Sequence, residues 1–266
     1  MEKKIQKSYE IDMCNGPLFG KIMLFTLPLL LSGILQLLFN AADVVVVGRF
    51  AGNEALAAVG STGALTNLLV NLFIGMSVGA NVLVARYYGG KQEEEVSRTV
   101  HTSMLVSAAG GIILAVLGIV LAKPLLLLMD TPDNVINHSV LYMRIYFLGM
   151  PVMLIFNFGS AILRAVGDTR RPLFYLIIAG VINVALNLWF VIGFHMGVAG
   201  VALATVISQC VSTALIVRSL IKSEGCLRLC PERLCMDWEK FGKIAAIGLP
   251  AGLQGSLFSI SNVLIQ

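Results

Sequence analysis

Charged residues are scarce in this 266-residue chain. They make up 13% of it, against 57% hydrophobic residues. A soluble domain carries about one-quarter charged residues, so the composition excludes an ordinary soluble protein. The mean hydropathy of +0.86 indicates a membrane protein as well. The net charge of +4 does not call for a nucleic-acid partner, because the basic residues follow the connecting stretches and form no single face.

Signatures of catalysis are also missing. The chain has no G-x-x-x-x-G-K-[ST] phosphate loop and no H-E-x-x-H zinc motif. Cys226, Cys230 and Cys235 have a spacing that fits no zinc pattern and are read as free thiols. His101, like the other two histidines, lies near the end of an apolar run and is expected to be an interfacial residue. We predict a protein that is not an enzyme, has no cofactor beyond a coupling ion, and draws energy from an ion gradient.

Long apolar runs take the place of these features. A helix needs about 20 mainly apolar residues to cross a bilayer. The runs are far longer than barrel strands and do not alternate, so they are predicted to be helices. The complete candidates are 20–48, 56–84, 99–122, 140–163, 172–193 and 199–220. A seventh begins near Phe241. The predicted fold is therefore an all-α integral membrane protein, with a six-helix lobe plus the start of a seventh helix and no cleavable signal peptide.

Basic residues are distributed unevenly between alternate connecting stretches. Sixteen of the 19 Lys and Arg residues fall on the side that includes the N-terminus, and only Arg49, Lys123 and Arg144 fall on the other. Positive charge collects on the cytoplasmic side of membrane proteins. This asymmetry predicts a multi-pass protein of the plasma membrane with a cytoplasmic N-terminus.

An internal repeat indicates the architecture. Residues 19–40 align without a gap to residues 241–262, and both copies open on Phe-Gly-Lys-Ile and contain Leu-Pro. Six predicted helices separate the copies, so both enter from the same side, as in transporters built from parallel repeats. We predict an N-terminal six-helix lobe at 1–220, a cytoplasmic linker at 221–240 and the start of a second lobe at 241–266. The remainder of that C-terminal lobe would be a partner from the same protein.

One acidic side chain, Asp43, stands inside apolar sequence, whereas the other fourteen Asp and Glu residues lie in polar stretches or at span ends. A carboxylate within a span costs about 2.5–3.5 kcal/mol and usually serves to bind or move a cation. The competing interpretation is a structural carboxylate that reaches the interface near Arg49. Gln36 and Asn40 share a helical stripe with Asp43. Pro28 removes one backbone hydrogen bond from the same helix and permits a bend there.

The chain resembles the multidrug and toxic compound extrusion (MATE) transporters, most closely the bacterial NorM- and DinF-like branch. The resemblance is carried by Leu27-Pro28 with Asn40 to Asp43, by LRAVGDTRRP at 163–172, and by Asn183, Asn187 and the run 197–209. It implies a twelve-helix transporter of two lobes that exchanges H⁺ or Na⁺ for organic, often cationic, compounds. It also implies a polar cluster of Asp43, Asn183, Asn187 and Thr205. Many relatives carry a second Asp where this chain has Asn187, so ion choice is left open.

The chemistry of this cluster suits either ion. One carboxylate with amide and hydroxyl oxygens could hold Na⁺, which is a hard cation, and burial could instead favour protonation of Asp43. Interhelical amide contacts are the structural alternative for Asn183 and Asn187. Further residues expected to line the substrate cavity are Gln36, Asn40, Asn67, Asn71 and Asn157. The turn that holds Asp168 and Arg171 is interpreted as a structural hinge.

Two other functions compete with export of organic compounds. A flippase for a lipid-linked precursor or polysaccharide would share the architecture but would need several basic residues facing its cavity. A channel or purely structural membrane protein would require neither Asp43 nor a duplicated lobe. The lipid bilayer is the surrounding partner in each case.

Overall fold

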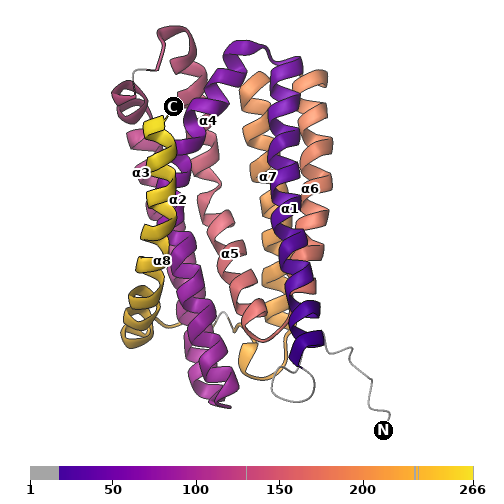
Figure 1. Cartoon of the computed structure of the whole chain (residues 1–266), viewed down its shortest axis with the longest axis vertical. Helices are drawn as coiled ribbons and strands as arrows, with labels where there is room; N and C mark the ends of the chain where they lie inside the picture. Colours follow the sequence, from indigo (N-terminus) through magenta and orange to yellow (C-terminus); the bar gives the residue numbers. More distant parts are fainter. Residues whose placement is uncertain (1–17, 130, 231, 233, 266) are drawn as a thin grey trace.

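The computed structural model describes residues 18–129, 131–230, 232 and 234–265, and within these ranges the regular structure is entirely helical (Figure 1). The α-helices are α1 (Leu18–Phe50), α2 (Asn53–Gly89), α3 (Glu93–Leu128), α4 (Asp133–Leu148), α5 (Met150–Ala165), α6 (Arg170–Leu188), α7 (Gly197–Lys222) and α8 (Trp238–Ile265). A π-helical turn, η1 (Trp189–Gly193), extends α6, and a short 3₁₀ turn, η2 (Gly225–Leu227), follows α7.

Five of the described helices are long and apolar enough to cross a membrane, and α4 with α5 forms one further broken span. The six-helix lobe predicted from composition is therefore present. One prediction was wrong: the run 140–163 is not a single helix. It belongs to α4 and α5, which meet at a bend of 47°.

Gly149 and Pro151 explain this bend. Pro151 has no backbone N–H to donate to the preceding turn, and its ring disfavours a continuous helix. Gly149 allows a close approach to α7, because a Cβ atom there would lie 2.7 Å from Val206 Cγ2. The bend thus has local causes that a hydropathy reading does not detect.

Helices α1 and α8 begin at the same end of the bundle (Figure 1), as a parallel repeat requires. Helix α8 packs along α2 through facing glycines. A Cβ atom at Gly75 would overlap the backbone of Gly252, and one at Gly79 would overlap the carbonyl of Ile244. Residues 75–79 read Gly-Met-Ser-Val-Gly, a pattern that also occurs around catalytic serines. Here it lies in mid-helix, where the Ser77 hydroxyl donates to the Ile74 carbonyl at 2.6 Å, so it is a packing surface.

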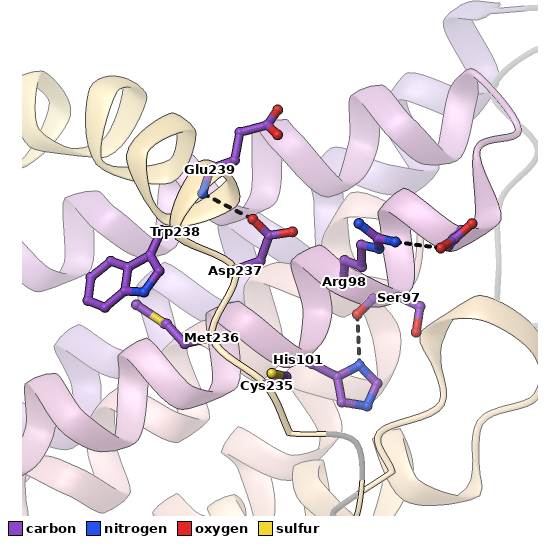
Figure 2. Close-up of a pocket in the computed structure, with 9 residues that line it drawn as sticks. Ser97, Arg98, His101, Cys235, Met236, Asp237, Trp238 and Glu239 are labelled. Atoms are coloured by element: carbon purple, nitrogen blue, oxygen red, sulfur yellow. Dashed lines mark hydrogen bonds and ion pairs between the residues drawn. The ribbon is translucent and has the colours of Figure 1, made fainter.

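The segment between α7 and α8 is attached to the first turns of α3. The Cys230 N–H donates to Nε2 of His101 at 3.1 Å, and the Asp237 N–H donates to Thr102 Oγ1 at 3.3 Å. Lys240 pairs with Glu95. Figure 2 shows the groove of about 610 Å³ along this contact, between α3 and residues 235–239. His101 is buried here, and its other ring nitrogen, Nδ1, lies 2.7 Å from the Ser97 carbonyl oxygen, so it has partners that the sequence did not reveal.

The turn between α5 and α6 carries a buried aspartate, Asp168. Asp168 is fully buried; it accepts a hydrogen bond from the Arg171 N–H at 3.1 Å and pairs with the Arg171 guanidinium. Arg171 Nη1 also donates to Ser219 Oγ on α7 at 3.0 Å. Burial raises the pKa of the Asp168 carboxyl, and the bonds from Arg171 oppose that effect. These contacts agree with the structural role predicted for this turn.

Candidate ion-coupling site between α1, α6 and α7

Three helices bring the four predicted coupling residues into one hydrogen-bonded chain. Asp43 lies on α1, Asn183 and Asn187 lie one turn apart on α6, and Thr205 lies on α7. The Asn187 amide donates to Asp43 Oδ1 and, at 3.2 Å, to Asn183 Oδ1. The Asn183 amide donates to Thr205 Oγ1 at 3.3 Å. Thr205 donates in turn to the Val201 carbonyl at 3.0 Å.

The hydrogen bonds determine how the Asn187 amide is oriented. A charged carboxylate only accepts hydrogen bonds, so the NH₂ group of Asn187 faces Asp43. Its two hydrogens then serve Asp43 and Asn183. The carbonyl oxygen Oδ1 of Asn187 is left buried without a hydrogen-bond partner. A buried acceptor without a partner costs about 1–3 kcal/mol, so this oxygen is a ready ligand for a cation or a proton donor.

Asp43 itself has no cationic partner among the ion pairs of the described residues. Its side chain is half-buried, whereas Arg49 near the end of α1 is exposed. Of the structural alternative, a carboxylate that reaches the interface near Arg49 or pairs with a neighbour, the structure shows a bond to the Asn187 amide and no ion pair with Arg49 among the described residues. Asp43 instead turns toward an uncharged amide.

Oxygen is the only ligand type that this arrangement offers. The described residues contain no cluster of three or more His, Cys, Asp or Glu side chains that could hold a metal ion. A carboxylate with amide and hydroxyl oxygens suits a hard cation and suits soft transition metals poorly. Asp43 and the unpartnered Oδ1 of Asn187 would be the main ligands to Na⁺.

The residues expected to line a substrate cavity are scattered. Gln36, Asn40 and Asn67 are exposed on α1 and α2. Asn71 is half-buried and donates to the Gly255 carbonyl of α8 at 3.3 Å. Asn157 donates to the Met153 carbonyl of its own helix at 2.9 Å. The described structure thus uses Asn71 and Asn157 in helix packing, and their contact with a substrate stays a prediction.

Pro28 lies within α1 and is buried. Its carbonyl oxygen accepts a hydrogen bond from the Ser32 hydroxyl at 2.8 Å.

Sequence reasoning missed Asn81, whose amide donates to the Ala161 carbonyl at 2.6 Å and ties α2 to α5. A polar residue in mid-span was the available signal.

Fold and site together define a helical lobe of a membrane transporter. A family model described as MatE matches residues 28–189. "Probable multidrug resistance protein YoeA" of Bacillus subtilis (strain 168) is 35% identical over 249 residues, covering 91% of this chain and 54% of that protein. The chain belongs to the MatE family, whose members are transporters and not enzymes.

Solved structures of MATE transporters have the same fold over the part that this chain covers. An outward-facing conformation of a multidrug resistance MATE family transporter of the MOP superfamily superposes with a TM-score of 0.84 and 25% identity, covering 90% of this chain and 53% of that one. A MATE protein in the bent conformation gives 0.82 and 25%, covering 88% and 52%. The chain spans about half the length of the relatives it matches.

Proposed function

We propose that the whole protein is a secondary active antiporter that exports organic, mainly cationic, compounds in exchange for H⁺ or Na⁺. The observation that carries this proposal is the uncompensated Asp43 carboxylate beside a buried amide oxygen that has no partner. A carboxylate site with no cationic side chain beside it is suited to the reversible binding of one positive ion.

Filling the site changes the electrostatics between α1 and α6. With Asp43 charged, the Asn187 NH₂ group faces it and Oδ1 is unsatisfied. If the Asn187 amide turns over, its Oδ1 can accept a hydrogen bond from a protonated Asp43, or bind Na⁺ together with the carboxylate. Either event neutralises the charge and alters the relative stability of two helix packings. Differential stability is sufficient to drive alternation between inward- and outward-open states.

Pro28 is the proposed bend point of α1. It lies in mid-helix, four turns before Asp43, where the backbone ladder already lacks one donor. Solved MATE relatives are described in a bent and in a straight conformation, so proteins with this fold take more than one shape. We infer that α1 bends differently with the site filled and empty.

Drug export is favoured over the flippase alternative. A phosphate-carrying substrate requires several basic residues in the cavity, and Arg144 is the one basic residue of this sequence that could lie within a predicted span. The name of the Bacillus relative, a probable multidrug resistance protein, supports the same choice. We place the protein in the plasma membrane with a cytoplasmic N-terminus, and a second lobe completes the substrate cavity.

The test is dye efflux by the whole protein in vesicles with imposed Na⁺ or pH gradients. Replacing the carboxylate, Asp43→Asn, should abolish gradient-driven efflux while the protein still reaches the membrane. Glu54→Gln makes the same chemical change at an exposed position of α2 and should leave efflux intact. Undiminished efflux by Asp43→Asn would refute the coupling role.

A further inference from the structure

Helix α1 is held loosely compared with the rest of the lobe. Between residues 23 and 45 only Pro28 and Ser32 are buried. Leu35 and Phe39 are half-buried and pack against the apolar cluster that includes Leu176 of α6. Few contacts therefore determine where α1 lies on α6, and each has a large influence on the position of Asp43.

Phe39 makes the closest of these contacts. Its ring lies directly over Gly180 of α6, so that a Cβ atom at Gly180 would overlap three ring atoms. Gly60 of α2 is a contrasting case, because a Cβ atom there would meet nothing within 4 Å. The absence of a side chain at Gly180 is thus a specific requirement of the contact between α1 and α6.

This contact and the coupling site belong to the same helix interface. Phe39 precedes Asp43 by one turn on α1, and Gly180 precedes Asn183 and Asn187 by one and two turns on α6. Both helices start from the same end of the bundle (Figure 1). The ring of Phe39 on Gly180 therefore determines the register that places Asp43 opposite Asn187.

We propose that Phe39, seated on Gly180, is a positioning contact that aligns the Asp43 carboxylate with the Asn187 amide. Phe39 and Gly180 touch no ion themselves. They act through the position of α1, and the inference rests on the coupling role proposed for Asp43. Overpacking such a contact displaces the helix, because packed side chains cannot compress.

The experiment measures the cation concentration that gives half-maximal efflux by the whole protein in vesicles. Gly180→Ala should shift this midpoint about fivefold or more, the usual size of an overpacking effect. Phe39→Ala removes the contact and should shift the midpoint as well, but in the double variant Phe39→Ala/Gly180→Ala the methyl group no longer meets the ring, so its shift should be smaller than the combined shifts of the two single variants. Gly60→Ala, the same change in open space, should leave the midpoint unchanged.

Three results would overturn the proposal. One is a native midpoint in Gly180→Ala protein that reaches the membrane normally. Another is a double variant whose shift equals the combined shifts of its single variants, since coupled residues deviate from additivity. If Gly180→Ala fails to reach the membrane, Phe39→Leu replaces it, and a native midpoint there counts equally against the contact. Loss of efflux in Asp43→Asn with native midpoints elsewhere would refute only the positioning role.

Discussion

Two aspartates of this lobe differ in their environment: Asp168 is fully buried, and Asp43 is half-buried. Asp168 in the turn between α5 and α6 has an arginine and a backbone N–H as partners, and that arginine is fixed to α7. Asp43 in α1 has an amide and no cation among the described ion pairs. A compensated carboxylate fixes a structure, whereas an uncompensated one is free to exchange a proton or a metal ion. This difference separates a structural acid from a candidate coupling acid.

The largest expected effect is on the structural acid. Asp168→Ala removes the carboxylate that pairs with the Arg171 guanidinium, and breaking a buried pair costs about 3–5 kcal/mol. We expect a much lower melting temperature and poor yield, with gradient-driven efflux per surviving molecule near the native value. Thermal unfolding in detergent together with efflux normalised to protein amount would measure this. Native stability in Asp168→Ala would remove the distinction between the two acids.

A smaller effect is expected from giving Asp43 a second acid. Asn187→Asp places two carboxylates side by side, because the Asn187 side chain contacts Asp43. The extra charge should tighten binding of the coupling cation by about tenfold or more, since like charges in a shared site attract one positive ion together. Isothermal titration with Na⁺, and the pH dependence of efflux, would show whether the site binds Na⁺ or H⁺ more tightly than before. Unchanged binding of both ions would mean that Asn187 does not face the ion site.

Much of this lobe could be predicted from its sequence, because long apolar runs leave the chain few alternatives. The lone acid within an apolar run identified Asp43, and the resemblance to MATE transporters identified Asn183, Asn187 and Thr205, which the structure joins to it across α1, α6 and α7. The ion role of these residues stays a proposal. Other features depend on packing between distant segments. The bend at Gly149, the buried position of His101 and the contact of Phe39 with Gly180 involve residues whose apolar or end-of-run character suits many positions.

Asn71 and Asn157 illustrate why the sequence does not assign the residues that line a cavity. An amide in a span is equally suited to a ligand and to a neighbouring backbone carbonyl. In the described structure both amides donate to helix carbonyls, one across the contact between α2 and α8 and one within α5. Sequence alone does not distinguish these uses, since both satisfy the same donors.

Distances between spin labels on the first half of α1 and on α6 of the whole protein test the central claim most directly. If the charge state of Asp43 controls how α1 lies on α6, adding the coupling ion should change the distance distribution in native protein. In Asp43→Asn protein the distribution should be the same with and without the ion. An ion-dependent change that persists in Asp43→Asn, or a native distribution that no ion alters, would contradict the account.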